Sequence, residues 1–258
     1  MKSVETPAGD FQVVSHAEWL KARKAFLQEE KEFTRRRDEL SRRRRALPWV
    51  KVEKNYVFDA PEGKVSLADL FGGRHQLIVY HFMFDPKWSQ GCKSCSLLAD
   101  HYDPSAIHLE HRDATMVTVS RAPIEKLEAF RKRMGWKSRF VSSFANDFNR
   151  DFHVSFTPDE LESGDAVYNF VPASFGISEA PGISVFYRDD RGTIFHTYSS
   201  YARGLEDFIG AYRLLDIVPK GRDEEGIGGM SWVRHHDRYG DKNFVDPWNE
   251  KSAAPARR

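Results

Sequence analysis

The sequence has very little cysteine, no long apolar run and almost no net charge. Its 258 residues include two cysteines, and its formal net charge is +1. A near-zero charge gives no general reason to expect nucleic acid or an anionic membrane surface as a partner. No apolar stretch approaches the roughly 18 residues that cross a bilayer, and residues 1–10 contain no apolar segment of the kind found in signal peptides. We therefore expect a cytoplasmic protein with no membrane contact.

The two cysteines are close together, in the order Cys92-Lys93-Ser94-Cys95. A bridge between them would close almost no loop, so it would add little to the stability of the fold. In a reducing compartment, such a pair is typical of redox catalysis or of metal binding rather than of a structural disulfide. The function of the chain is therefore to be sought first at this motif.

Apolar runs of strand length alternate with helical patterns, which indicates an α/β fold. Residues 76–84 are almost continuously apolar, as is typical of a central parallel strand that is buried on both faces. Residues 114–120 form a second such strand, and residues 183–187 and 193–198 have the pattern of a hairpin. Helices are expected over residues 94–102, 123–134 and 205–215. We predict a mixed sheet with helices on both faces.

Residues 1–48 are expected to form a helical extension. Ser15 and Glu18 have the spacing of a capping box, which predicts a helix that begins there. Apolar residues recur along it at every seventh position, namely Trp19, Phe26, Phe33, Leu40 and Leu47. The stripe is narrow and one-sided, so we predict that this helix lies along the domain. A coiled coil that joins two copies of the chain is the alternative.

Two further segments extend the central domain, which we place at residues 49–218. Between about residues 137 and 180, phenylalanine recurs at every fourth position from Phe140 to Phe156. This insertion is predicted to add a satellite core packed on the sheet, with a ligand pocket as the alternative. Residues 219–258 form a C-terminal extension rich in Gly, Asp, Glu and Arg, and we expect disorder from residue 249 onward.

The CxxC motif follows a predicted buried strand and precedes a predicted helix. Unpaired backbone N–H groups and the helix dipole stabilise a thiolate at a helix N-terminus, so the pKa of Cys92 should fall. Lys93 adds a nearby positive charge. We expect Cys92 to be the more exposed cysteine and the nucleophile, and Cys95 to resolve the mixed disulfide that it forms. Trp88, four residues earlier, is placed to shield the disulfide face, and we expect Trp88 and Lys93 to contact the substrate.

The chain resembles the thioredoxin superfamily over about residues 50–216. The resemblance rests on QLIVYHFMF followed by CKSC, on the strand APGISVF and on the hairpin after it. It implies a thioredoxin-like fold in which Pro181 is cis and packs opposite Cys92 and Cys95. There Pro181 would shape the substrate-binding groove and help to exclude metals, and an X–Pro bond is the one that adopts cis at low cost.

The whole chain also looks like a bacterial family of thioredoxin-like proteins known as a domain of unknown function. The shared phrases are YHFMF, GCKSCS, SRAPIEKLEAF, DFNRDF, HTYSSYARG and SWVRHHD. Thioredoxins carry a buried aspartate on the central strand as a proton relay, whereas the nearest positions here are Tyr80 and His81. His81 is a candidate for that role because histidine titrates near neutral pH. The alternative for His81 is a hydrogen-bonded core histidine.

A peroxiredoxin-like thiol peroxidase is an alternative function. Residues 57–84 resemble the opening of peroxiredoxins. Pro86, Ser89 and Cys92 nearly reproduce the active-site motif of that family, with one residue fewer between the proline and the serine. Arg121, at the end of its predicted strand, would then supply a positive charge beside the thiolate.

Two non-enzymatic alternatives are a metal site and a redox-silent adaptor. A metal would be held by the two cysteines with His101, His235 or His236. However, a zinc site needs about four ligands, and the chain has a single CxxC. The run from His235 to Asp237 is more simply explained as an exposed polar turn. An adaptor would use the fold and the N-terminal helix to bind another protein.

The prediction from sequence is a cytoplasmic thiol–disulfide oxidoreductase of thioredoxin-like fold that needs no bound cofactor and no metal. Its partner would be a protein or a small molecule that carries a disulfide or a thiol, and a second dithiol protein or a small thiol would supply the electrons.

Overall fold

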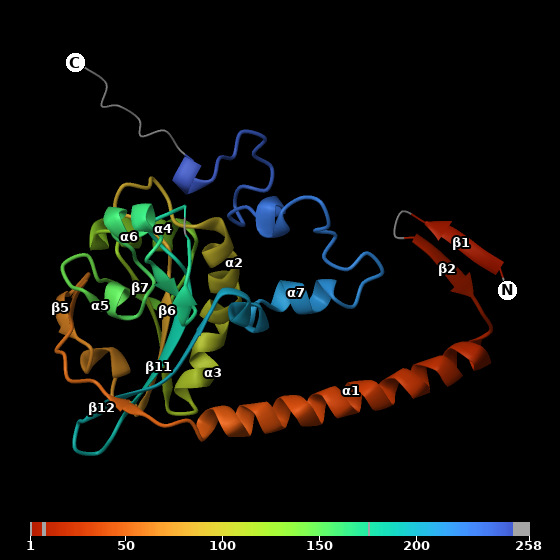
Figure 1. Ribbon diagram of the computed structural model, residues 1–258, viewed down its shortest axis with the longest axis horizontal. Helices are drawn as coiled ribbons and strands as arrows, with labels where there is room; N and C mark the ends of the chain where they lie inside the picture. The colour runs from red at the N-terminus through yellow and green to blue at the C-terminus, as the bar shows by residue number, and fades with distance from the viewer. Residues whose placement is uncertain (1, 7–8, 175, 250–258) are drawn as a thin grey trace. The chain divides into compact units, whose positions relative to one another are not determined.

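The computed structural model describes residues 2–6, 9–174 and 176–249. The chain forms two compact units (Figure 1), which are Met1–Pro48 with Ala211–Asp223, and Trp49–Gly210 with Glu224–Arg258. The first unit contains the long N-terminal helix, and the second contains the large sheet and both cysteines. In the part of the chain that is described, no helix is both long enough and apolar enough to cross a membrane.

The smaller unit begins with a hairpin and continues into one long helix. The strands β1 (Lys2–Thr6) and β2 (Gly9–Val13) pair antiparallel, and the helix α1 spans His16–Arg45. The predicted capping box is present. Ser15 Oγ accepts the N–H of Glu18 at 3.3 Å, and the Glu18 carboxylate accepts the N–H of Ser15 at 3.0 Å. The predicted helix is confirmed, whereas the hairpin before it was not predicted.

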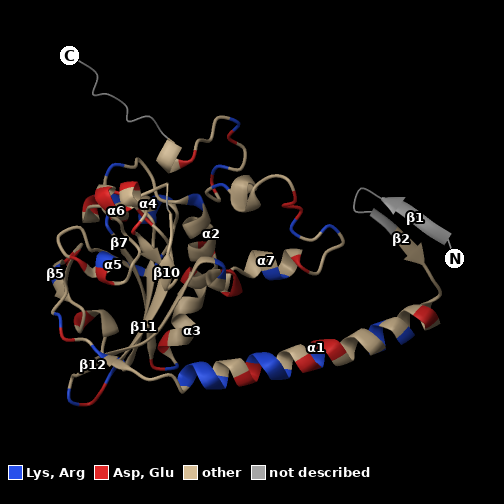
Figure 2. Cartoon of the chain, in the orientation of Figure 1, with Lys and Arg blue, Asp and Glu red and all other residues tan. Residues whose placement is uncertain are grey.

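The apolar stripe of α1 is exposed to solvent, and the helix has no buried residue. Trp19, Phe26 and Phe33 are 52%, 55% and 63% exposed. The last turn carries four arginines at positions 42–45, seen as the basic end of α1 in Figure 2. That this helix lies along the domain, or joins two copies of the chain, stays a prediction.

The larger unit is built on one mixed sheet of eight strands. Their order is β3, β12, β11, β6, β7, β8, β4, β5. The central strands β6, β7 and β8 are parallel, whereas β11 pairs antiparallel with β6 and β12 pairs antiparallel with β11. The strands are β3 (Val50–Lys51), β4 (Val57–Ala60), β5 (Gly63–Ser66), β6 (Gln76–His81), β7 (Ala114–Ser120), β8 (Arg139–Ser142), β11 (Gly182–Arg188) and β12 (Ile194–Tyr201).

This topology confirms the predicted fold class, a thioredoxin-like mixed sheet flanked by helices. The chain leaves β6, forms α2 (Lys93–Tyr102), returns as the parallel strand β7, and later adds the antiparallel hairpin of β11 and β12. The two predicted buried strands and the predicted hairpin are found within a few residues of their expected ends. β6 lies within the sheet, between β11 and β7, and its residues Leu77 and Val79 are accordingly fully buried.

Helices cover both faces of the sheet. Neighbouring residues of β6 point to opposite sides of the sheet, so they contact different helices. On one side, Tyr80 packs edge-to-face against Tyr102 of α2 at 5.5 Å. On the other side, His81 stacks on Phe148 and Phe152, which lie in and next to α5 (Phe148–Asp151). The remaining helices of this unit are α3 (Ala106–Glu110), α4 (Ile124–Arg133) and α6 (Pro158–Ser163).

The predicted insertion is joined to the sheet more closely than its sequence indicated. Its first strand, β8, belongs to the main sheet, and Phe148 and Phe152 belong to the core of that sheet rather than to a satellite. Phe156 is part of a separate small cluster, and Phe144 is 57% exposed. Four of the five phenylalanines in this series are therefore buried, and Phe144 is the exception.

The last predicted helix is divided in two. Residues Ala202–Phe208 form a 3₁₀ helix, and α7 spans Gly210–Leu215. The division falls at Ile209, whose backbone is extended with φ −99° and ψ 94°. Between residues 224 and 249, the last described residue, the regular elements are two short 3₁₀ turns, Gly229–Trp232 and Pro247–Asn249. Disorder was expected from residue 249 onward, but Asn249 ends the second of these turns, and residues 250–258 lie outside the described residues.

Phe148→Ala and Phe144→Ala form a matched pair that tests this core. Phe148 is fully buried against aromatic side chains on both sides, so its truncation should lower the free energy of unfolding by about 3–5 kcal/mol. Phe144 is mostly exposed, so the same change there should cost about 0.5 kcal/mol or less. Urea unfolding of both variants measures the difference, and equal losses would contradict the described packing.

Candidate functional site

Cys92 is the N-cap residue of α2, and its sulfur takes part in the cap. The chain enters the helix from the loop that follows β6, where the N–H of Cys92 donates to Met83 O at 3.0 Å. The Cys92 sulfur then accepts the N–H of Cys95 at 3.4 Å. A side-chain acceptor at the N-cap satisfies one of the free N–H groups of the first helical turn. Both cysteines are free thiols here.

The two thiols have opposite pKa shifts. The pKa of Cys92 is lowered, mainly by a hydrogen bond from the Cys95 thiol and further by the backbone N–H groups of Cys95 and Ser94, although burial opposes them. The pKa of Cys95 is raised well above its usual value, first by burial and then by its position beside Cys92. Cys92 is therefore the group that ionises first, and Cys95 retains its proton.

Cys92 is buried, so the expectation that it is the more exposed cysteine is wrong. Cys92 and Cys95 are each only 2% exposed. The turn that carries them is enclosed by the C-terminal segment of the same unit. Lys93 Nζ donates to Ser231 O at 3.2 Å and forms an ion pair with Asp246 at 2.8 Å. The sequence contains no local signal of this enclosure, because the two segments are about 140 residues apart.

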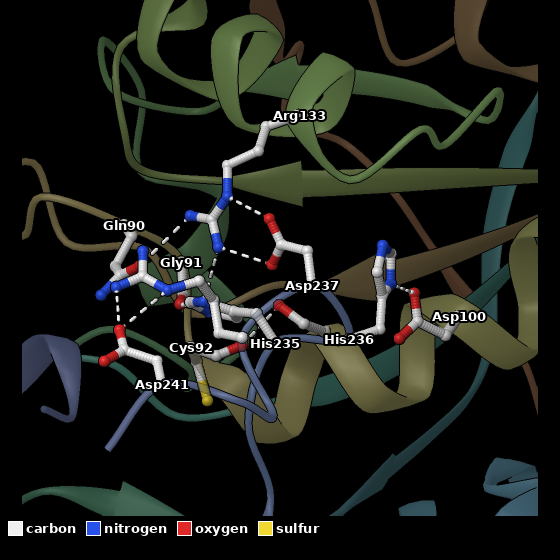
Figure 3. Close-up of polar contacts among 11 residues, drawn as sticks. Gln90, Gly91, Cys92, Asp100, Arg133, His235, His236, Asp237 and Asp241 are labelled. Atoms are coloured by element: carbon white, nitrogen blue, oxygen red, sulfur yellow. Dashed lines mark hydrogen bonds and ion pairs between the residues drawn. The ribbon is translucent and has the colours of Figure 1, made fainter. Parts of the chain in front are cut away.

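His235 joins the C-terminal segment to the residue before Cys92 (Figure 3). Its Nε2–H donates to Gly91 O at 2.8 Å, and its Nδ1 accepts from Arg133 Nη2 at 3.2 Å. His235 is fully buried, and burial lowers its pKa to about 4. It is thus neutral near pH 7, with its proton on the nitrogen that faces Gly91. The interpretation of this run as an exposed polar turn is wrong for His235.

The neighbours of His235 fix the same segment to two helices. Arg133, the last residue of α4, forms two hydrogen bonds with the Asp237 carboxylate at 2.9 and 2.8 Å. The Nδ1 of His236 lies 2.8 Å from the Asp100 carboxylate of α2 (Figure 3). His235 and His236 were considered only as possible metal ligands, and Asp100, Arg133 and Asp237 were not among the predicted site residues. The shared phrase SWVRHHD could have drawn attention to the residues of the C-terminal segment, but no sequence signal pointed to their partners on the helices.

Of the predicted substrate-contacting residues, Trp88 and Lys93 lie beside the cysteine turn and both contact the C-terminal segment. The Trp88 ring lies 5.8 Å from the ring of Trp248. Pro181 differs from what the resemblance implied, because every peptide bond in the described residues is trans. Trans is the form an X–Pro bond adopts by default, and the Pro181 carbonyl accepts the hydroxyl of Tyr168 at 2.7 Å.

His81 does not fit the role of a proton relay. It is 1% exposed, and burial lowers its pKa to about 3, so it remains neutral throughout the physiological range. Its Nε2 is hydrogen-bonded to Ser184 Oγ at 2.8 Å, on the face of the sheet away from α2. The expectation of near-neutral titration is therefore wrong, and the alternative of a hydrogen-bonded core histidine describes it.

Tyr80, one residue before His81, is the side chain that reaches Cys95. Its hydroxyl is hydrogen-bonded to the Cys95 sulfur, and burial raises the pKa of the phenol well above its usual value. The Tyr80 hydroxyl therefore stays protonated and donates a hydrogen bond to the Cys95 sulfur. This bond lowers the pKa of the Cys95 thiol, against the larger effect of burial.

Arg121 takes part in a buried ionic cluster. Its guanidinium is 2.6 Å from the Glu179 carboxylate and 3.2 Å from that of Asp85. Ser155 Oγ also donates to Glu179, at 2.7 Å. The peroxidase alternative expected the positive charge of Arg121 to lie beside the Cys92 thiolate. The Arg121 guanidinium is instead bonded to two carboxylates. Ser89, the serine of that alternative, is exposed.

Glu179 titrates in an unusual range for a carboxyl group. Burial raises its pKa to about 7, and this effect exceeds the opposing attraction of Arg121. Glu179 is 1% exposed and directly precedes the segment of Ala180 and Pro181. A buried acid with this pKa changes its charge near neutral pH, at the edge of the strand that was expected to hold the substrate.

No group of three or more His, Cys, Asp or Glu side chains in the described part of the chain has an arrangement that would hold a metal ion. His235 uses both ring nitrogens in hydrogen bonds, as described above. The metal alternative therefore has no ligand set among these residues.

Comparison with known proteins places the chain in a family without an established activity. The model of a family described as "Bacterial protein of unknown function (DUF899)" matches residues 8–239. No curated protein matches the chain. The chain has weak similarity to solved structures, among them a peroxidoxin BcpB, a PrxQ and a putative thiol:disulfide interchange protein DsbE.

The BcpB, from Mycobacterium tuberculosis, is 12% identical with a TM-score of 0.42, and the match covers 65% of this chain and 97% of that one. The PrxQ of Xylella fastidiosa is 13% identical with a TM-score of 0.41, over 64% of this chain and 94% of that one. The DsbE of Chlorobium tepidum is 13% identical with a TM-score of 0.39, over 64% and 97%. These values are too low to transfer an activity.

Glu179→Gln should change how stability depends on pH. Because the pKa of Glu179 is raised from 4.5 in the unfolded chain to about 7 in the folded protein, the folded state binds the extra proton in between. The wild-type protein should therefore lose stability relative to the variant as the pH rises from about 4.5 to about 7. Urea unfolding of both proteins across this range measures the difference, and a difference that is constant with pH would contradict the assignment.

Tyr80→Phe should slow the step in which Cys95 attacks. Loss of one hydrogen bond of about 1 kcal/mol to the Cys95 sulfur corresponds to a decrease of about fivefold in the rate of Cys92–Cys95 disulfide closure. The pH profile of this step should move to higher pH. Tyr102→Phe is the matched control, since its hydroxyl bonds to Thr118 instead. Quenched reactions followed by mass spectrometry separate closure from the first attack, and an equal effect of both variants would refute the role of Tyr80.

Proposed function

This chain belongs to the DUF899 family, bacterial proteins of unknown function, and we propose that its activity is thiol–disulfide exchange at Cys92 and Cys95. The observation that supports this most strongly is the asymmetry of the two thiols. Cys92 caps α2 with a lowered pKa, whereas Cys95 is protonated and lies within hydrogen-bonding reach of the Cys92 sulfur. Exchange needs one thiolate that attacks and one thiol that follows.

In the first step, the Cys92 thiolate attacks one sulfur of a substrate disulfide. A bond forms between Cys92 and that sulfur, the substrate S–S bond breaks, and the second substrate sulfur leaves as a thiolate that takes up a proton. The N–H of Cys95, 3.4 Å from the Cys92 sulfur, stabilises the attacking anion before this step.

In the second step, Cys95 loses its proton and attacks the Cys92 sulfur. The Cys92–Cys95 disulfide forms, and the first substrate sulfur leaves as a thiol. Two electrons have then passed from the protein dithiol to the substrate, and the reverse sequence oxidises a substrate dithiol. The hydrogen bond from Tyr80 supports the transient negative charge on Cys95. A second dithiol protein or a small thiol would restore the reduced form.

The peroxidase alternative has less support from the geometry. It assigned the charge of Arg121 to Cys92, but this guanidinium is bonded to Glu179 and Asp85. In addition, Ser89 is exposed, whereas the Cys92 sulfur is hydrogen-bonded to the first turn of α2. The cytoplasmic location stays a prediction from the sequence.

Cys95→Ser should accumulate a mixed disulfide that Cys92→Ser does not form. With Cys95 absent, the adduct on Cys92 has no resolving thiol and persists. The reduced variants are incubated with an excess of oxidised glutathione, quenched in acid and weighed intact by mass spectrometry. The expected result is a stable glutathione adduct on the first variant and at least about a tenfold lower yield on the second.

The wild-type protein serves as the control, since it should pass through the adduct to the internal disulfide. Equal labelling of the two variants, or an adduct that persists equally in the wild type, would overturn the assignment of nucleophile and resolving thiol. Consumption of hydrogen peroxide that is lost in Cys92→Ser and retained in Cys95→Ser would favour the peroxidase instead.

A further inference from the structure

Residues 245–248 lie against both side chains that flank the cysteine turn. Asp246 forms the ion pair with Lys93, and Trp248 packs on Trp88. Trp88 and Lys93 are the residues that the sequence indicated for contact with a substrate. A segment of the chain itself therefore occupies the place where a substrate would have to bind to reach Cys92.

The first of these contacts is the ion pair between Lys93 and Asp246. The Lys93 side chain is 5% exposed and that of Asp246 is 25% exposed. A lysine ammonium that is almost fully removed from water requires a nearby negative charge, because an unpaired buried charge is costly. Lys93 directly follows Cys92, so any group that replaces Asp246 is held close to the reacting sulfur. Lys93 thus selects an acidic group at this position.

The second contact is aromatic. The rings of Trp88 and Trp248 are 5.8 Å apart and inclined by 56°. Both side chains are half-buried, so each supplies the other with apolar surface. The intervening Pro247 is buried and restricts the backbone between the acid and the aromatic ring. The sequence of chemical features is therefore acid, proline, aromatic.

The segment is held firmly at one end and loosely at the other. At the firm end, Val233 and His235 are fully buried, and His235 bonds to the Gly91 carbonyl. Toward the C-terminus, Val245 is 47% exposed and Asn249 is exposed. The outer part of this segment, residues 245–248, is consequently able to leave the turn by local opening, while His235 and the Phe244 ring that packs edge-to-face on it at 5.3 Å remain in place.

We propose that Trp88 and Lys93 form a peptide-binding surface beside Cys92, and that residues 245–248 occupy it as an internal ligand. The substrate is then a polypeptide that presents an acidic side chain to Lys93 and an aromatic side chain to Trp88, with its disulfide next to them. This inference rests on the exchange activity proposed above and specifies its substrate class. It also explains how a cysteine that is 2% exposed reacts, since the substrate displaces the internal segment.

Displacement also changes the charge around the thiol. Asp246 lies close enough to Cys92 for its negative charge to raise the pKa of that thiol, against the hydrogen bonds that lower it. Departure of the internal segment removes this charge together with the steric cover. The closed form therefore protects Cys92 from small oxidants in two ways.

The first test measures the rate of Cys92 alkylation by iodoacetamide in the full chain. Asp246→Asn and Trp248→Ala each remove one contact of the internal ligand, and each should accelerate alkylation by about tenfold. Asp190→Asn and Val245→Ala are the matched controls, because Asp190 is 98% exposed on a distant turn and Val245 is 47% exposed within the segment. They should change the rate by less than about twofold.

The second test measures binding directly and needs no thiol chemistry. A fluorescent peptide with the sequence of residues 241–249 is titrated against the wild-type chain and against the full-length double variant Asp246→Asn/Trp248→Ala. The double variant should bind it at least about tenfold more tightly, because its own segment competes less well. A peptide that carries the same two substitutions should bind neither protein.

Faster alkylation without binding of the native-sequence peptide would show that the segment is only a cover, and would overturn the proposed peptide surface. Unchanged alkylation with no binding would overturn both parts. If the peptide binds as expected but no mixed disulfide forms on Cys95→Ser, the surface stands and the exchange activity fails. Trp248→Ala alone provides the answer should the double variant prove unstable, since the Trp248 ring is only half-buried.

Discussion

The chemistry of this protein depends on one short contact, that between the Cys92 sulfur and the N–H of Cys95 in the first turn of α2. It exists because β6 ends at His81, the following loop returns the Cys92 N–H to Met83, and the helix starts at Lys93. Burial alone would raise the pKa of a thiol. At Cys92 the hydrogen bonds of the turn exceed this effect, whereas at Cys95 burial prevails. One helical turn thus makes two identical side chains chemically different.

The same burial that separates the two thiols also restricts access to them. A thiolate in an enclosed site is stabilised only by the groups that surround it, which here are N–H donors, a neighbouring thiol and, through Cys95, the Tyr80 hydroxyl. The enclosure comes from the C-terminal segment, through Lys93 and Asp246 and through His235 and Gly91. In the exchange mechanism that we propose, such an enclosed site depends on local opening, so the segment would influence both the reactivity of Cys92 and the choice of partner.

The strand β6 shows how far reasoning from sequence reaches. Its apolar run predicted a central strand, and alternation required that Tyr80 and His81 point to opposite faces. The tertiary packing decided that Tyr80 is the residue directed toward α2, since Tyr80 packs on Tyr102 and His81 packs on Phe148. His81 is a candidate relay by residue type because histidine titrates near neutral pH, but burial among phenylalanines removes that property. Side-chain chemistry assigned from residue type alone therefore failed at the position where the environment changes it most.

The amino-acid sequence by itself determined the features that depend on neighbours along the chain. These are the capping box of Ser15 and Glu18, the strand and hairpin patterns, and the placement of Cys92 and Cys95 at the start of a helix. Only the tertiary structure decided the burial of Cys92, the trans peptide bond at Pro181, and the partners of Lys93 and His235. The physical reason is distance along the chain: a cap or an alternation is complete within a few residues, whereas His235 and Gly91 are separated by 144 positions. Contacts of that kind form only when the whole sheet and its helices have brought both segments together.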